Sequence, residues 1–215
     1  MKIACLHTAQ SNVAVFEAAA EDLGLAAASL HHVVRADLLA AVERARVVAD
    51  DVKRATVSLL LDLAEEADAV VLTCSTLGLA AEAVREVVNV PVIRADRALA
   101  EQALVEGRHV IALCASATTL APTSALFSEI AERRGASFEM RLVPGIWELF
   151  RAGDMMGYFR RIAEAVQDTA SDGAVRVALV QASMAGAASL LDNRQRPLTS
   201  PSAALAEAVR QLRPH

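Results

Sequence analysis

Cys74 is the residue of this sequence whose type and surroundings are best suited to chemistry. It lies in Ala69–Gly78 (AVVLTCSTLG), where an apolar strand is expected to end at Thr73 and a helix to begin near Thr76. This places Cys74 at the carboxyl end of a parallel strand, where open α/β sheets bind ligands, and at a helix N-terminus, which favours a thiolate. The hydroxyls of Ser75 and Thr76 could hold a substrate carboxylate there. The pattern predicts a general acid/base, although a small buried cysteine ahead of a helix cap has the same appearance.

Two other polar loops are expected at the same sheet edge. The first predicted strand ends in residues 7–12 (HTAQSN), ahead of a helix that Ser11 or Asn12 would cap. In the second half, Ala115–Thr123 (ASATTLAPT) carries four hydroxyls directly after a strand. Hydroxyls at a helix start suit anion binding, and capping alone accounts for one or two of them.

The remaining histidines and cysteines give weaker signals. His7 is the histidine expected near these loops, either as an acid/base or as a structural residue. His31 and His32 end a predicted strand, but no second pair of ligands has metal-site spacing, so no metal site is predicted. Cys5 and Cys114 lie inside apolar strands and are expected in the core. The wide spacing of the three cysteines indicates neither a disulfide framework nor a CxxC site.

Short apolar runs alternate with amphipathic runs along the chain, as in folds where strands alternate with helices. The candidate strands are residues 2–7, 25–31, 69–73, 90–93, 109–114, 136–142 and 175–180. The candidate helices are residues 11–22, 36–66 (consistent with two helices that meet near Ala55), 76–88, 95–106, 119–134, 154–170 and 199–212. This order predicts an α/β fold with parallel sheets flanked by helices. The sequence has neither a GxGxxG after the first strand nor a GxxxxGK[ST], which argues against a dinucleotide fingerprint and a P-loop.

The two halves of the sequence resemble each other. At a single shift of 108 residues, Ile3–Thr8 pairs with Ile111–Ser116, and Val71–Gly78 pairs with Leu179–Gly186. Two strand-plus-loop pairs at one shift indicate a duplicated α/β unit. We expect two pseudo-symmetric lobes, residues 1–92 and 93–198, and a last helix, 199–215, that packs back on the first lobe.

Composition excludes several classes of protein. The 215 residues carry 21 Lys+Arg against 26 Asp+Glu, so no cationic face is expected for nucleic acid. Aromatic residues make up only 3 %, which argues against platforms that stack bases or sugars. No apolar run reaches the roughly 18 residues of a membrane span, and the N-terminus lacks the features of a signal peptide. The expected location is therefore the cytoplasm.

With these motifs in view, the chain resembles the aspartate/glutamate/hydantoin racemase superfamily over nearly its whole length. The resemblance rests on the duplicated unit, the Thr-Cys-Ser-Thr-Leu-Gly turn at 73–78 and the Ser/Thr-rich loop at 116–123. It implies two α/β lobes with an active-site cleft between them that uses no cofactor, pyridoxal phosphate or metal. One cysteine from each lobe is then expected on opposite sides of the substrate α-carbon. One thiolate removes the proton and the other thiol returns one. The resemblance is also compatible with a homodimer or a larger homo-oligomer.

In this family pattern Cys74 corresponds to the first-lobe cysteine, but the second cysteine is missing. The turn Gln181–Met184 (QASM) resembles a Cys-Ala-Gly-Met turn of hydantoin racemase relatives, which sets Gln181 against the missing cysteine. The internal shift of 108 residues sets Ala182 there instead. Neither residue has a thiol, and Gln181 can only form hydrogen bonds.

We therefore expect a cofactor-independent racemase-like or isomerase-like enzyme that uses Cys74 as the acid/base on a small carboxylate, amino acid or hydantoin-like substrate. The second proton would come from His7 or from water. The alternatives are a one-thiol decarboxylase of malonate-like acids and a non-catalytic protein that binds small carboxylates. The residues expected to bind substrate are Gln10, Ser11, Ser75, Thr76, Ser116, Thr118, Thr119, Gln181 and Ser183.

Overall fold

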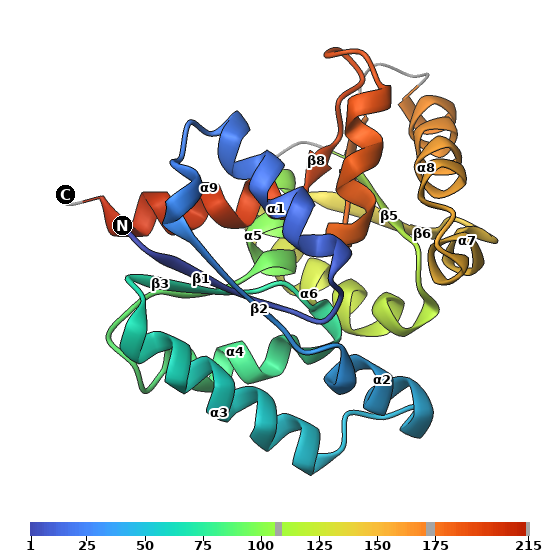
Figure 1. Cartoon of the computed structure of the whole chain (residues 1–215). Coiled ribbons are helices and arrows are strands. Elements are labelled where there is room, and N and C mark those ends of the chain that lie inside the picture. Colours follow the sequence, from blue (N-terminus) through green and yellow to red (C-terminus); the bar gives the residue numbers. More distant parts are fainter. Residues whose placement is uncertain (106–108, 171–174, 214–215) are drawn as a thin grey trace. The chain divides into compact units, whose positions relative to one another are not determined.

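A computed structural model describes residues 1–105, 109–170 and 175–213 (Figure 1). The chain divides into two compact units, which are described separately below. Unit 1 contains Met1–Ala98 and Pro201–His215, and unit 2 contains Leu99–Ser200. Each unit has one parallel four-stranded sheet with helices beside it, so the predicted α/β fold class with two lobes is confirmed.

Unit 1 is built on a sheet with the strand order β2-β1-β3-β4, in which every neighbouring pair is parallel. The strands are β1 (Ile3–His7), β2 (Leu30–Val34), β3 (Ala69–Leu72) and β4 (Val92–Arg94). The helices that belong to or begin in this unit are α1 (Ser11–Asp22), α2 (Ala36–Ala45), α3 (Asp50–Glu66), α4 (Gly78–Arg85) and α5 (Ala95–Ala103). Short 3₁₀ segments, η1 (Ala27–Ser29) and η2 (Ser75–Leu77), precede β2 and α4, and α9 (Ser200–Leu212) ends the chain.

The alternation of side chains along β1 gives the sheet of unit 1 two different faces. Ala4 and Leu6 join the apolar cluster formed with α2, α3 and α4, which lie on one face of the sheet (Figure 1). Cys5 and His7 point to the other face, where the ring of Phe16 from α1 lies edge-on to His7. The apolar face therefore anchors the sheet, and the opposite face carries buried polar groups.

Unit 2 repeats this plan with the strand order β6-β5-β7-β8. Its strands are β5 (His109–Cys114), β6 (Ser137–Leu142), β7 (Arg176–Leu179) and the short β8 (Leu198–Thr199). Its helices are α6 (Ala117–Arg134), α7 (Ile146–Ala152) and α8 (Met155–Ala170), and a long 3₁₀ segment, η3 (Ala182–Leu190), follows β7. Tyr158 and Ile162 of α8 and Met184 of η3 pack on Leu113 and Leu179 of the sheet.

Several elements differ from the sequence prediction, which contained neither the helix α7 nor the 3₁₀ segment η3. The strand expected at residues 25–31 begins only at Leu30, because Ala27–Ser29 form a 3₁₀ turn. The helical stripe at 36–66 is two helices, but the break follows Ala45 rather than Ala55, because Arg46 takes a left-handed backbone conformation (φ 57°). The strand β8 was not predicted, because two residues are too short for a periodic signal.

Equivalent hydrogen bonds in the two units correct the internal shift. The Thr73 amide donates to the Leu6 carbonyl, and the Val180 amide donates to the Leu113 carbonyl, both at 3.1 Å. These pairs are related by 107 residues, so the predicted shift of 108 is wrong by one for these strands. A one-residue slip changes which face of the sheet a side chain occupies. The corrected shift sets Cys74 against Gln181, not Ala182.

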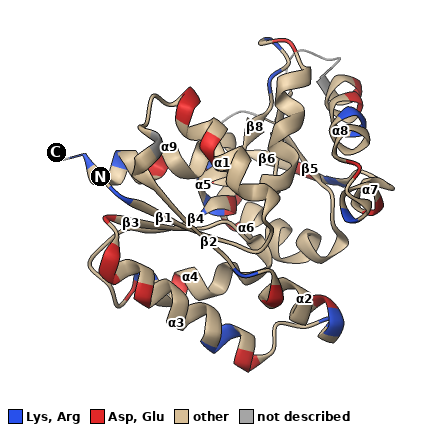
Figure 2. Ribbon diagram, viewed as in Figure 1, with Lys and Arg blue, Asp and Glu red and all other residues tan. Residues whose placement is uncertain are grey.

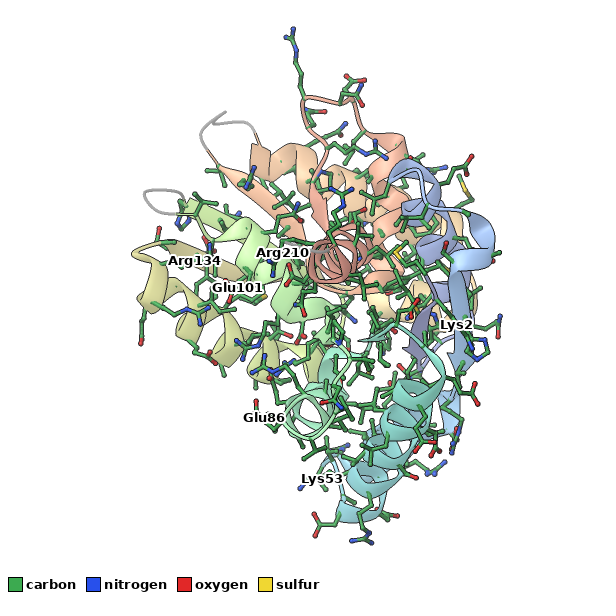
Figure 3. The ribbon with its side chains drawn as sticks, turned by 90° about the vertical axis from the view of Figure 1, so that its left-hand side faces the viewer. Lys2, Lys53, Glu86, Glu101, Arg134 and Arg210 are labelled. Atoms are coloured by element: carbon green, nitrogen blue, oxygen red, sulfur yellow. The ribbon has the colours of Figure 1, made fainter. Side chains whose placement is uncertain are left out.

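Charged residues are spread over the helices. Figure 2 shows acidic and basic residues interspersed along α3 and α8. The only two lysines, Lys2 and Lys53, lie well apart on unit 1 (Figure 3). Within the described residues, no helix combines the length and the low polarity needed to cross a membrane.

Candidate active site

Cys74 lies in the turn between β3 and α4, as the sequence predicted. Its backbone is still extended, and η2 begins at the next residue, with the Leu77 amide donating to the Cys74 carbonyl at 3.2 Å. Cys74 as a whole is 9 % exposed and packs with Leu72 and Leu77 in the apolar cluster of unit 1. The thiol therefore lies at the end of a buried strand with only a small part of its surface accessible.

Four hydrogen-bond donors lie close enough to Cys74 to lower the pKa of its thiol. They are the hydroxyls of Thr8 and Thr76 and the backbone amides of Thr76 and Leu77. Burial is the larger cause and raises the pKa of Cys74 above its ordinary value. The prediction that this turn favours a thiolate is corrected accordingly: the donors favour ionisation, but burial outweighs them and Cys74 is a thiol at neutral pH.

A buried ion-pair network supports this turn from β4. Arg94 is 7 % exposed and holds Asp96 through two bonds, Nε to Oδ1 at 3.0 Å and Nη2 to Oδ2 at 2.7 Å. A third bond joins Arg94 Nη1 to Glu82 of α4 at 3.3 Å. The guanidinium lies directly against Gly78, where an added Cβ would come within 2.5 Å of Arg94 Cζ. Gly78 is therefore required for this close approach at the start of α4.

In the loop after β1, the residue near Cys74 is not one of those that the sequence predicted. Gln10 and Ser11 are exposed, and neither caps α1 through its side chain. Asn12 is buried, and its Oδ1 has no hydrogen-bond partner in the described part of the chain. The residue of this loop that contacts Cys74 is Thr8, which sequence reasoning did not single out. Its position two residues after the buried strand residue Leu6 was the available signal.

In unit 2, Gln181 occupies the position of Cys74. Its carboxamide Oε1 accepts the backbone amide of Ala115 at 2.5 Å and that of Ser116 at 2.9 Å. The Cys114 thiol also lies 3.5 Å from this oxygen and donates to the Ser116 carbonyl at 3.1 Å. The amides at the start of the Ser/Thr-rich loop are thus satisfied by a side chain of the same unit.

The other predicted residues of unit 2 fall into two groups. Ser116 is the N-cap residue of α6, and its Oγ lies 2.8 Å from Thr118 Oγ1, with Thr118 exposed and Thr119 buried. Ser183 is buried, and its Oγ lies 3.0 Å from the Tyr158 hydroxyl. Burial raises the pKa of Tyr158, so this hydroxyl stays neutral and acts as a hydrogen-bonding group.

His7 and Cys114 hold equivalent positions at the ends of β1 and β5. Their carbonyls accept equivalent amides, from Arg35 and Val143 respectively, both at 2.8 Å. Burial, followed by the charge of His32, lowers the pKa of His7 to about 3. His7 is therefore neutral at physiological pH, which does not support it as the donor of the second proton.

A family model described as Asp/Glu/Hydantoin racemase matches residues 5–209 of the chain. None of the curated proteins compared with the sequence matches it significantly. The family model covers both the turn at Cys74 and its counterpart at Gln181.

Three solved structures illustrate the similarity of fold. An aspartate racemase homologue from Pyrococcus horikoshii has 15 % identity and a TM-score of 0.66, with 98 % of each chain covered. The aspartate racemase of Picrophilus torridus has 12 % identity and a TM-score of 0.69, covering 99 % of this chain and 94 % of the other. The allantoin racemase of Klebsiella pneumoniae has 18 % identity and a TM-score of 0.63, covering 98 % and 86 %. The family match supports a function of the racemase or isomerase type, and the solved structures show that the chain shares their fold.

Proposed function

We propose that this chain, which belongs to the Asp/Glu/Hydantoin racemase family, exchanges the proton on the α-carbon of a small carboxylate, amino acid or hydantoin-like substrate, with Cys74 as the acid/base. The observation that carries this proposal is the set of four donors that lower the pKa of Cys74. Such donors stabilise the thiolate, so the sulfur can give up a proton and take one back within a single environment. No cofactor takes part in the proposed step.

The proposed step begins when the Cys74 thiol loses its proton to water. The thiolate then removes the α-proton, and the electron pair passes to the adjacent carbonyl or carboxylate group. The enolate-like charge that develops needs hydrogen-bond donors in fixed positions. In unit 1 we assign this role to Ser75 and Thr76, which are partly exposed beside the sulfur. Gln10 and Ser11, which follow β1, also have exposed polar side chains. They complete the group of substrate-binding residues that we propose for unit 1.

In unit 2 we propose that substrate contacts come from the Ser/Thr-rich loop and the Gln181 turn. The residues are Ser116, Thr118, Thr119, Gln181 and Ser183. Gln181 cannot transfer a proton at neutral pH, so a symmetric reaction with one thiol from each unit is not open to this chain. Cys74 then acts alone, and any proton delivered to the opposite side of the α-carbon comes from water.

A second candidate is favoured by the raised pKa of Cys74. A thiol that is protonated at rest is a proton donor, as the last step of decarboxylating a malonate-like acid requires. Loss of CO₂ leaves an enediolate, the Cys74 thiol protonates its carbon, and water restores the thiol. This reaction needs one thiol only and therefore has no need of a counterpart at Gln181.

Hydrogen–deuterium exchange at the α-carbon tests the first proposal. The chain is incubated in D₂O with L- and D-aspartate, L- and D-glutamate, a hydantoin and allantoin, and loss of the α-proton signal is followed by NMR. Malonate-like acids are followed in parallel for release of CO₂. We expect wild-type exchange with at least one substrate, its loss in Cys74→Ser and its retention in Cys114→Ser, which removes another buried thiol.

The possible outcomes of this experiment distinguish proton exchange by Cys74, decarboxylation and binding without turnover. Equal exchange in wild type and Cys74→Ser would remove the catalytic role of Cys74. CO₂ release that depends on Cys74, without exchange, would replace the first proposal by the second. Ligand-induced thermal shifts that persist in Cys74→Ser, with neither reaction, would identify a protein that binds small carboxylates without turnover.

A further inference from the structure

Cys5, His7 and His32 form a compact group of soft and borderline donors in unit 1. Cys5 and His7 are two residues apart on β1, so their side chains lie on the same face of the sheet. His32 pairs with Cys5 across the parallel β1–β2 ladder and therefore lies on that face as well. One ligand atom from each residue can be chosen so that all three lie within 4.8 Å of one another.

The hydrogen bonds of His7 orient its ring with one nitrogen toward this group. Thr73 donates its hydroxyl to the Leu6 carbonyl at 3.0 Å, so its oxygen accepts the Nδ1–H of His7 at 3.1 Å. His7 Nε2 then carries the lone pair and faces His32 Nδ1 at 2.9 Å. A histidine whose other nitrogen is held by a backbone-anchored acceptor is the usual arrangement around a bound metal.

We propose that Cys5, His7 and His32 form a binding site for a thiophilic transition-metal cation of the Zn²⁺ type. A tetrahedral zinc ion with one sulfur and two nitrogen ligands holds its ligand atoms roughly 3.3–3.6 Å apart. His7 Nε2 and His32 Nδ1, at 2.9 Å, are slightly closer than this, and ligand atoms of all three residues lie within 4.8 Å of one another, so metal binding requires an adjustment of the side chains. The set of one thiolate and two imidazoles suits zinc and copper rather than magnesium or calcium.

The proton balance of metal binding is defined by this geometry. The cation displaces the proton of the Cys5 thiol to solvent, and His32 moves its proton from Nδ1 to Nε2, a nitrogen with no partner in the described structure. Because a cysteine binds a metal as its thiolate, one proton per chain is released when the metal binds. Burial lowers the pKa of His32, and the negative charge of the nearby Glu17 opposes this effect.

Access and surroundings agree with a site of this kind. Cys5 and His7 are fully buried, and His7 packs on the edge of Phe16. His32 is partly buried and lies on β2, the edge strand of the sheet. Cys74 belongs to the apolar cluster on the other face, so this group is separate from the proposed acid/base.

The test is titration of the purified, metal-free full-length chain with Co²⁺ as a spectroscopic probe, followed by competition with Zn²⁺. We expect one ion per chain, a thiolate-to-cobalt charge-transfer band and release of one proton. Cys5→Ser should abolish the band, and His32→Asn should weaken binding by about 100-fold or more. Thr73→Val, which keeps the shape and removes the acceptor for His7, should weaken it by about 10- to 100-fold.

The controls separate this site from other thiols and from unfolding. Cys114→Ser keeps the cluster and should bind Co²⁺ as the wild type does. Because Cys5 is buried and its replacement could disturb β1, the partly exposed His32 provides the decisive variant, with circular dichroism checking its fold. Absence of binding by the wild type, or a charge-transfer band that is unchanged in Cys5→Ser and His32→Asn, overturns the proposal.

Discussion

Arg94 and Asp96 form a two-bond ion pair that is buried where β4 passes into α5. The same sequence, Arg-Ala-Asp, occurs where β2 passes into α2, and Arg35 and Asp37 form the same pair through Nε and Nη2. The pair at β2 is exposed, whereas the pair at β4 has side chains 7 % and 2 % exposed. One chain thus contains the same local motif in two solvent environments.

Loss of one partner should therefore have very different effects at the two positions. Asp96→Ala leaves the Arg94 charge buried and should lower the free energy of unfolding by about 3–5 kcal/mol. Asp37→Ala breaks an exposed pair and should cost at most about 1 kcal/mol, because water replaces the partner. Urea unfolding of the two variants and the wild type measures both values. Equal losses would show that burial does not decide the strength of this motif.

Gly78→Ala should destabilise the chain through a clash with Arg94. The new Cβ would meet a guanidinium that is held by Asp96 and Glu82, so the network or the start of α4 must shift. We expect a loss of about 1–3 kcal/mol in unfolding free energy, the usual range for overpacking. Because Cys74 lies just before this helix, α-proton exchange should fall as well.

A double-mutant cycle supplies the control for this prediction. In an Arg94→Ala background the obstructing group is absent, so adding Gly78→Ala should cost close to nothing. If Gly78→Ala costs the same in both backgrounds, the contact with Arg94 is not the reason for the glycine.

The sequence predicted the fold well because parallel α/β units have strong local signals. The helix at Ser11–Asp22 has the predicted bounds, and the turn at Cys74 lies where the apolar run of β3 ends. The predicted end of a helix was wrong where the backbone conformation of a single residue ends it, as Arg46 ends α2. Periodicity reports which side chains are buried, but it does not report a left-handed residue.

The surroundings of the site could not be predicted to the same extent, because they depend on contacts between strands. His32 meets Cys5 only through the β1–β2 pairing, so metal-ligand spacing along the chain does not reveal the group. The raised pKa of Cys74 follows from burial, which outweighs donors that the sequence did suggest. Pairing and burial are properties of the folded chain rather than of a motif.

Gln181 should contribute to stability as an acceptor in unit 2. Gln181→Leu removes the oxygen that accepts the amides of Ala115 and Ser116, which should cost about 1–3 kcal/mol in unfolding free energy. Gln181→Glu keeps an acceptor and should retain most of the stability. Gln167→Leu changes an exposed glutamine of α8 and should have an effect within about 0.5 kcal/mol. A Gln181→Leu variant as stable as the wild type contradicts this role.

The pH dependence of Cys74 should reflect the balance between burial and its donors. Since the pKa of Cys74 is raised, its alkylation by iodoacetamide should be slow at neutral pH and should have a midpoint above the value of 9.0 for an ordinary cysteine. Thr76→Val removes a hydroxyl that lowers this pKa, so the midpoint should move further up. Mass spectrometry of the Cys74 peptide measures the rate at each pH.

The same shift determines how stability depends on pH. A thiol whose pKa is higher in the folded chain than in the unfolded chain favours folding below the unfolded value, and this contribution is lost as pH rises through the folded value. Cys74→Ala should therefore flatten the fall of the unfolding free energy above about pH 9, by up to roughly 1.4 kcal/mol per pH unit. The buried Cys5 thiol, also of raised pKa, still contributes to the fall that remains in this variant. A midpoint for Cys74 below 9.0 would instead mean that the four donors outweigh burial and that Cys74 is poised as a base.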